Sequence, residues 1–204
     1  MPGCCHGPPI VVLRYYQIYK PFGVLSQFSV ALEGKRGLGS LYPFPRDVYP
    51  LGRLDEDSEG LLLLTNDTLQ NSVFLGQGVE KRYLVQVEGR VADGQLEPMR
   101  RGMNIRIKGQ LHGCLPVEVE VLLAPPALPE RTPAVRYRKS VPDTWLMLTL
   151  REGKNRQVRR MTAALGFPTL RLVRWSIGAF TLEGMKPGEV REMPAALFTA
   201  TRRF

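Results

Sequence analysis

The sequence predicts an α+β fold in which a mixed, largely antiparallel sheet carries flanking helices. Many short segments are rich in β-branched and aromatic residues, whereas only a few have a helical pattern. Strand and helix segments do not alternate regularly, as a parallel sheet with crossover helices would require. No G-x-G-x-x-G or G-x-x-x-x-G-K turn occurs, which disfavours the nucleotide-cofactor folds. The 204 residues suffice for one domain, or for two small lobes that share a core.

The strands are predicted from alternating apolar residues and from short apolar runs. Residues 80–88 are the clearest case, because Tyr83, Val85 and Val87 share one face together with Lys81. Residues 61–64 are an apolar run whose length fits a buried strand. We expect the strands 104–108 and 117–123 to pair antiparallel. The remaining predicted strands are 11–19, 24–28, 144–150, 169–175, 177–182 and 190–193.

Three shorter helices are predicted from capping residues and breakers. A short helix can begin within residues 38–41. Asn66-Asp67 can cap a helix over residues 68–75, and Asp93 can cap one over 95–101. The polar segment 33–39 and the basic tail 199–204 are expected to lie outside regular structure.

A fourth helix is predicted after Asn155, which we take as its N-cap, and it ends at Gly166. Apolar residues at helical spacing are expected to face the core, and arginines at helical spacing to share another face. The apolar set is Val158, Met161 and Leu165, and the basic set is Arg156, Arg159 and Arg160.

Composition indicates an intracellular protein with a polyanionic partner. The formal net charge is +9, and nucleic acid is the commonest partner of so basic a chain. Three cysteines are too few for a disulfide framework, and no apolar run is long enough to span a membrane. We therefore expect no membrane partner and a cytoplasmic location. Two histidines leave little room for chemistry based on a histidine base.

The N-terminal residues 1–10 are expected to be a disordered leader, followed by a single domain over 11–204. The leader contains Cys4-Cys5-His6, but adjacent cysteines are poorly spaced for chelation and no second cluster completes four ligands. We expect no metal there.

Two stretches of opposite charge suggest a cleft. Residues 50–67 contain five acids and one base, a net charge of −4, and residues 151–160 contain five bases and one acid, a net charge of +4. The acidic stretch alone could be a solvated turn. An arginine near one of its carboxylates would keep that group ionised, which suits a nucleophile or an electrostatic stabiliser rather than a general acid. The other arginines would be free for phosphate oxygens.

Residues 124–142 contain five prolines and four basic residues around Tyr137, and are expected to lack regular structure. Long loops of this kind are often functional. Contact with a phosphate backbone and a simple solvated loop explain the composition equally well.

Four motifs, in order along the chain, resemble those of the pseudouridine synthases that modify ribosomal RNA, a branch that includes the enzyme acting on the small subunit. The motifs are Gly52-Arg53-Leu54-Asp55 with Ser58 to Asn66, Lys81 to Val85, Glu152 to Met161, and Leu172 to Arg174 with Ile177-Gly178. A narrower likeness, to the E-type synthases of the large ribosomal subunit, lies in residues 141–146 and 166–172. Many relatives begin with an S4 RNA-binding domain, and this chain has no room for one before Tyr15.

The resemblance implies a catalytic domain of two lobes around a central cleft, without an S4 domain, acting as a monomer and without a metal or redox cofactor. It implies that Asp55 is the nucleophile on a flipped-out uridine of 23S ribosomal RNA, either naked or in an assembling particle. Tyr83 would stack on the uracil, Arg159 would hold Asp55 in an ion pair, and Leu172 would be the apolar wall. From its position beside Asp55, Arg53 could be a second partner for Asp55 or could fill the space left by the flipped base, and we favour the second role. Lys81, Lys154 and Arg156 complete the expected substrate-binding set.

Attack at the base, attack at the sugar and a glycal route are all compatible with one carboxylate. Two other functions stay open from the residues alone. One is a non-catalytic RNA-binding or ribosome-assembly factor. The other is a glycoside hydrolase that uses Asp55 with Glu59, which would need one carboxyl with a raised pKa. In the interpretation that we favour, Glu56, Asp57 and Glu59 are structural.

Overall fold

The computed structural model describes residues 12–30, 33–75, 78–135 and 141–200. The predicted leader 1–10 therefore lies outside the described residues. Nine of the described strands form one sheet with the central order β13-β1-β5-β11-β6-β10-β9, in which β4 pairs with β5 and β12 with β11. All pairings except that of β5 with β11 are antiparallel, which confirms the predicted fold class. The strands of this sheet are β1 (Tyr15–Lys20), β4 (Tyr49–Pro50), β5 (Glu59–Thr65), β6 (Lys81–Glu88), β9 (Glu118–Val121), β10 (Asp143–Leu150), β11 (Thr169–Ile177), β12 (Phe180–Thr181) and β13 (Val190–Glu192).

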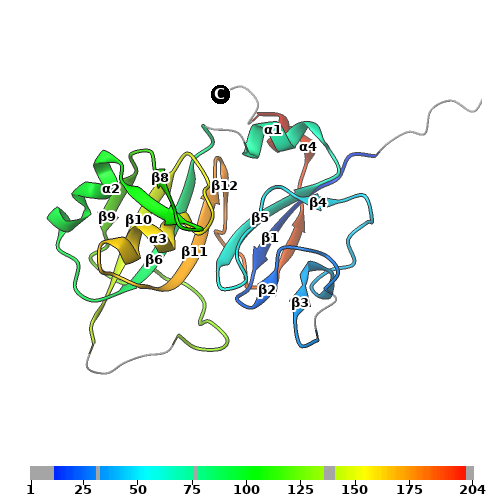
Figure 1. Cartoon of the computed structure of the whole chain (residues 1–204). Coiled ribbons are helices and arrows are strands. Elements are labelled where there is room, and N and C mark those ends of the chain that lie inside the picture. Colours follow the sequence, from blue (N-terminus) through cyan, green and yellow to red (C-terminus); the bar gives the residue numbers. More distant parts are fainter. Residues whose placement is uncertain (1–11, 31–32, 76–77, 136–140, 201–204) are drawn as a thin grey trace, which may run out of the picture.

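The sheet has two halves that meet where β5 lies parallel to β11. This junction has only two register pairs, Val173 with Glu59 and Arg174 with Gly60. Gly60 has φ +118°, and a Cβ there would lie 2.4 Å from the carbonyl oxygen of Arg174. The close approach therefore requires glycine. Figure 1 shows the two halves as two lobes, with β1, β5 and β13 in one lobe and β6, β10 and β11 in the other.

The buried hydrophobic residues among those described form three clusters, and one of them joins the two lobes. One cluster lies within the lobe of β6, β10 and β11 and includes Val85, Leu148 and Met161. A second lies behind β1 and β5 and includes Ile18 and Leu62. The third contains residues of both halves, and so the lobes share a core. Its buried members include Tyr19, Leu61 and Leu63 from the first half and Leu84, Trp145 and Val173 from the second.

The helices are α1 (Leu69–Leu75), η2 (Asp93–Leu96), α2 (Glu97–Arg101), α3 (Gln157–Ala164) and α4 (Ala195–Ala200), with the short 3-10 turn η1 (Leu38–Ser40). Asp67 caps α1 as predicted, since its Oδ1 accepts a hydrogen bond from the Leu69 N–H at 3.1 Å. Asp93 is not a cap. It lies inside η2 and binds Arg100 instead. Helix α4 covers the start of the tail that we predicted to be irregular, and residues 201–204 lie outside the described ones.

The predicted cap of α3 is also wrong. Asn155 precedes the cap position, which Arg156 occupies in a left-handed conformation with φ 51° and ψ 34°. This conformation is uncommon for a residue with a side chain. The predicted faces of the helix are partly confirmed: Val158 and Met161 are buried, and Leu165 packs against the same core cluster.

The predicted pairing of residues 104–108 with 117–123 is wrong. Strand β7 (Asn104–Ile107) pairs with β8 (Gln110–Gly113), a strand that we did not predict, and β9 pairs with β10. The reason is the turn between them, where Lys108 and Gly109 have φ of 49° and 85°. Two consecutive positive φ values make the tight hairpin turn whose twist matches its strands. The predicted loop 33–39 likewise contains β3 (Arg36–Gly37), which pairs with β2 (Val24–Leu25).

The proline-rich segment 124–135 has no helix or strand, as predicted, and it contacts both lobes. The Pro129 carbonyl accepts a hydrogen bond from Arg171 at 2.9 Å. The Arg131 guanidinium lies 4.2 Å from the centre of the Phe22 ring, in the first lobe. Arg131 thus packs against the protein. The other basic residues of this loop, and Tyr137, fall in 136–140, outside the described residues.

No helix among the described residues is long and apolar enough to cross a membrane. Within the same residues, no group of three or more histidine, cysteine or acidic side chains is placed to hold a metal ion.

Candidate active site

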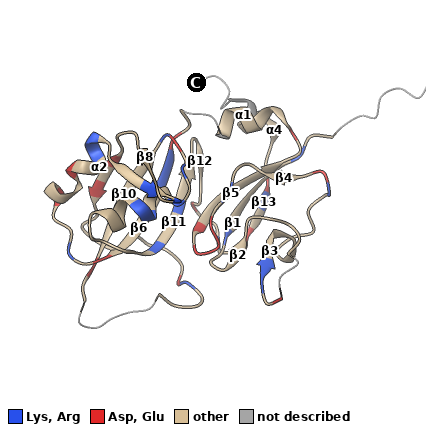
Figure 2. Ribbon diagram, in the orientation of Figure 1, with Lys and Arg blue, Asp and Glu red and all other residues tan. Residues whose placement is uncertain are grey.

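A cleft of about 330 Å³ lies where the two halves of the sheet meet. One wall comes from the segment before β5, and the other comes from β6, β11 and the start of α3. Five cationic side chains and one carboxylate line it, so the cleft is strongly positive. These are Arg53, Lys81, Lys154, Arg156 and Arg174, with Asp55. In Figure 2 the acidic segment at the start of β5 faces basic segments of the other lobe.

Asp55 projects from a loop that backbone hydrogen bonds hold on both sides. The Ser58 N–H donates to the Asp55 carbonyl at 3.0 Å, which closes a turn. The Ser26 hydroxyl donates to the Leu54 carbonyl at 2.8 Å and accepts from the Leu54 N–H at 3.0 Å. The Asp55 side chain is 37% exposed at the cleft wall. The loop is therefore fixed while its carboxylate stays accessible.

Asp55 and Asp57 share Arg156 at the start of α3, and Asp57 also binds Arg159. Arg156 makes a two-point contact with Asp57, at 2.9 and 2.6 Å, and its Nη1 lies 3.6 Å from Asp55 Oδ2. Arg159 donates to the Asp57 carbonyl at 2.5 Å, and its Nε lies 3.4 Å from the Asp57 carboxylate. The predicted ion pair between Arg159 and Asp55 is thus not the one formed. Arg156, in the left-handed conformation, thus contacts both carboxylates, and Arg159, three residues later, contacts Asp57.

Asp57, which we predicted to be structural only, links both arginines. Burial raises the pKa of Asp57, but the Arg156 hydrogen bonds and the charges of Arg159 and Arg156 outweigh burial and hold the pKa below its ordinary value. Asp57 therefore works as an ionised anchor. It fixes the two guanidinium groups without occupying the cleft, since Asp57 is not among the lining residues.

The opposite wall is a platform formed by neighbouring strands. Tyr83 on β6 lies opposite Arg174 on β11, and Leu172 lies opposite Val85. Tyr83 and Leu172 are only 8% and 6% exposed, and both line the cleft. Lys81, two residues before Tyr83 on the same face, also lines it. Burial first, and then the charge of Arg174, lower the pKa of Lys81.

The remaining predicted residues lie around the cleft. Arg53 is exposed on the acidic loop, and Lys154 forms a close ion pair with Glu152. Glu152 is itself bound by Gln157 at 2.6 Å and by the Leu115 N–H at 2.9 Å. Seven of the eight predicted site residues line the cleft, and Arg159 lies behind it against Asp57.

Two cleft features were missed from the sequence. The anchoring role of Asp57 had no local signal. Arg174 did have a local signal in the sequence. It follows Leu172 by two residues in a strand, so that both side chains face the same way.

A buried ion pair lies behind the acidic loop. Glu59 is 2% exposed and accepts two hydrogen bonds from Arg171, both at 2.8 Å. Lys20 is fully buried beside it, where its ammonium donates to the carbonyls of Pro21 and Val24. Burial lowers the pKa of Lys20 to about 8, against the opposing charge of Glu59. Glu59 does not line the cleft and is fully engaged, and so it is not available as a second catalytic carboxyl.

Comparison with known proteins assigns the chain to a family. Residues 14–164 match the family model described as RNA pseudouridylate synthase. The chain belongs to the RNA pseudouridylate synthase family. It is 49% identical over 176 residues to the ribosomal large subunit pseudouridine synthase E of Vibrio vulnificus, a match that covers 85% of this chain and 72% of that protein. It is 47% identical over 170 residues to the protein of that name from Xanthomonas axonopodis, covering 82% and 87%.

The solved structures agree with the fold. A crystal structure described as a pseudouridylate synthase superposes with a TM-score of 0.74 at 25% identity, over 94% of this chain and 75% of that one. The chain is therefore an RNA pseudouridine synthase, an isomerase, with the α+β fold of that family.

Proposed function

We propose that this protein converts one uridine of large-subunit 23S ribosomal RNA to pseudouridine, with Asp55 as the nucleophile. The observation that carries this proposal is the position of Asp55, which is a fixed, accessible carboxylate across a positive cleft from Tyr83 and Leu172. The choice of large-subunit RNA rests on the identity of 46–49% to four proteins named as ribosomal large subunit pseudouridine synthase E.

The reaction is an isomerisation and balances without a co-reactant. The bond between N1 of uracil and C1′ of ribose breaks, and a bond between C5 and C1′ forms. C5 then loses its proton and N1 gains one. Asp55 can assist by attack at the base, by attack at the sugar or on a glycal route, and in each case it must be ionised. Arg156 Nη1 lies 3.6 Å from the Asp55 carboxylate.

The other residues hold the base and the RNA. A base in folded RNA has to be flipped out to reach the cleft, which costs a few kcal/mol. Tyr83 would stack on the uracil, Leu172 would pack against it, and Lys81 would lie at the edge of the platform. Arg53 would fill part of the gap that the base leaves, while Lys154 and Arg156 would contact phosphates at the cleft mouth. Arg159 would act through Asp57, which it holds in place.

Mapping pseudouridines in 23S RNA tests this proposal. Cells that lack the protein should lose one pseudouridine, and the wild-type gene should restore it. The gene for Asp55→Ala should not restore it. Asp93→Asn is the matched control, because Asp93 is a surface carboxylate that binds Arg100 on the outer helix. Full modification with Asp55→Ala would show that the nucleophile is assigned wrongly, and an unchanged 23S map without the protein would reject the substrate.

A further inference from the structure

Arg174 is a buried cation that forms no ion pair with any carboxylate among the described residues. The side chain is 5% exposed, and its Nε donates to the Leu61 carbonyl at 2.8 Å. Its Nη2 is buried with no hydrogen-bond partner, and no carboxylate among the described residues lies within ion-pair distance of it. A buried donor that lacks a partner costs stability, and native proteins contain few of them. A bound ligand that accepts a hydrogen bond would supply the partner that Nη2 lacks among the described residues.

The neighbouring carboxylate is engaged elsewhere. Glu59 is the residue next to the partner of Arg174 in the β5–β11 register, but it is bound at two points by Arg171. Removal of Arg174 would therefore not free a counter-charge. The positive charge of Arg174 acts instead on Lys81 and Lys20. In both lysines burial is the main cause that lowers the ammonium pKa, and the charge of Arg174 lowers it further.

The position of Arg174 points to the ligand. Arg174 lies directly opposite Tyr83 in the register of β11 with β6, and side chains of such pairs stand side by side on one face. Both residues line the cleft. The cations Arg53, Lys154 and Arg156 come from loop segments that line the cleft, whereas Arg174 and Lys81 come from the strands β11 and β6.

We infer that Arg174 donates a hydrogen bond to a carbonyl oxygen, O2 or O4, of the flipped uracil. This inference rests on the proposed function. A guanidinium can only donate hydrogen bonds, and uracil offers two acceptors, O2 and O4, on either side of N3–H. Cytosine carries an amino donor in place of O4. A donor-only group facing O4 would reject cytosine, and one facing O2 would contribute affinity without that selection.

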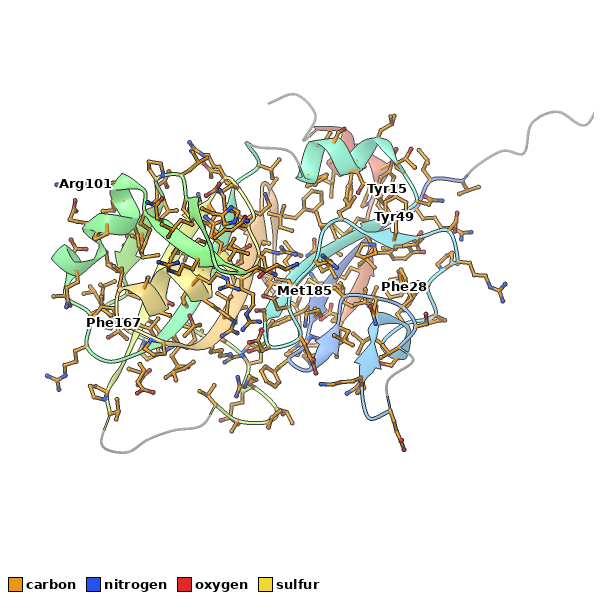
Figure 3. The ribbon with its side chains drawn as sticks, viewed as in Figure 1. Tyr15, Phe28, Tyr49, Arg101, Phe167 and Met185 are labelled. Atoms are coloured by element: carbon orange, nitrogen blue, oxygen red, sulfur yellow. The ribbon has the colours of Figure 1, made fainter. Side chains whose placement is uncertain are left out.

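The experiment compares wild-type protein, Arg174→Gln and Arg174→Lys on a 23S fragment that holds the target uridine. The rate of pseudouridine formation and the dissociation constant are measured with uridine, 2-thiouridine, 4-thiouridine and an abasic nucleotide at the target position. Arg101→Gln is the matched control, since Arg101 lies at the outer end of α2 (Figure 3) with its side chain 81% exposed. Thermal unfolding of each variant reports whether it folds.

We expect Arg174→Gln to lower kcat/KM about 10- to 100-fold, the range of a hydrogen bond to a charged group. Wild-type protein should lose activity with one of the two thiouridines, because sulfur is a weak acceptor, and Arg174→Gln should show no further loss with it. Binding of abasic RNA should be equal in both. Arg174→Lys, which keeps the charge but not the fork, should stay impaired.

Three outcomes overturn the inference. Full activity of Arg174→Gln is the first. Equal rates of wild-type protein on uridine and on both thiouridines are the second. Weaker binding of abasic RNA by Arg174→Gln would assign Arg174 to a phosphate instead of the base. Should the variants fail to unfold cooperatively, the thiouridine series with wild-type protein decides alone. A wild-type protein that forms no pseudouridine on 23S RNA would instead reject the proposed function.

Discussion

The acidic loop and the start of β5 carry two carboxylate–arginine sites, which differ in their exposure to solvent and in their partners. Beside the cleft, the side chains of Asp55 and Asp57 are each 37% exposed and share Arg156, the cap residue of α3, while Asp57 also binds Arg159. Four residues after Asp55, the side chain of Glu59 is 3% exposed and holds Arg171 of β11 in a two-point pair. The first site keeps a carboxylate within reach of solvent and substrate. The second fastens the two halves of the sheet. Burial and partner, more than residue type, separate the proposed nucleophile from the structural acid.

The largest effect that separates the two sites should come from Asp55→Asn. We expect at least a 1000-fold loss of turnover, as for removal of other nucleophiles, because the amide cannot attack. The free energy of unfolding should change by less than about 0.5 kcal/mol, because the side chain is partly exposed. Single-turnover kinetics and urea unfolding measure the two quantities. A large loss of stability would mean that Asp55 is a structural residue.

Glu59→Gln should give the reverse pattern. It leaves Arg171 buried without a counter-charge, and breaking such a pair costs about 3–5 kcal/mol. The double change Glu59→Leu with Arg171→Met, which removes both charges, should recover most of this loss. Urea unfolding of all three proteins measures it. If Glu59→Gln were as stable as wild type, the pair would not fasten the junction.

Asp57→Asn should lower turnover less than Asp55→Asn does. The amide still accepts hydrogen bonds but no longer holds two guanidinium groups by charge, and we expect turnover to fall about 10- to 100-fold. The rate of the chemical step should fall more than RNA binding, because Asp57 does not line the cleft. Single-turnover rates at saturating protein separate the two effects. A pure binding defect would contradict the anchoring role.

The smallest effect concerns pH. The pKa of Asp57 is lower in the folded protein than in the unfolded chain, so its contribution to stability is present above the ordinary pKa, near 3.8. That contribution is lost as pH falls through the lower, folded value. It should amount to about 1 kcal/mol or less, since the side chain is partly exposed. Urea unfolding of wild type and Asp57→Asn should converge toward acid pH and differ at pH 7. If the unfolding free energies of the two proteins differed by the same amount at every pH in that range, the ion pairs of Asp57 would not be the source of the difference.

Local patterns in the sequence predicted much of this molecule. Alternation in residues 80–88 placed Tyr83 and Lys81 on the cleft face, and helical spacing placed Val158 and Met161 in the core. Opposite charges predicted that the acidic loop and the start of α3 would meet, and they do.

What failed depended on backbone conformations that side-chain patterns do not fix. Arg156, not Arg159, is the arginine near Asp55, and nothing in residues 151–160 signals its left-handed conformation. The positive φ of Lys108 decides that β7 turns back on β8, although lysine is not a residue that favours this conformation. The structural role of Glu59 was predicted, but its partner Arg171 was not, because the two residues are 112 apart in the chain.

The parallel junction of β5 with β11 also dictates when the enzyme becomes active during its synthesis. Strand β5 is complete at Thr65, but the partner that completes the cleft ends at Ile177, and β1 receives its second neighbour only with Val190–Glu192. Contacts between such distant segments form late, because a long loop has to close first. A nascent chain that already displays Asp55 therefore lacks Leu172, Arg174 and the shared core. The uridine-modifying surface comes into being only after β11, which ends at Ile177, has been made.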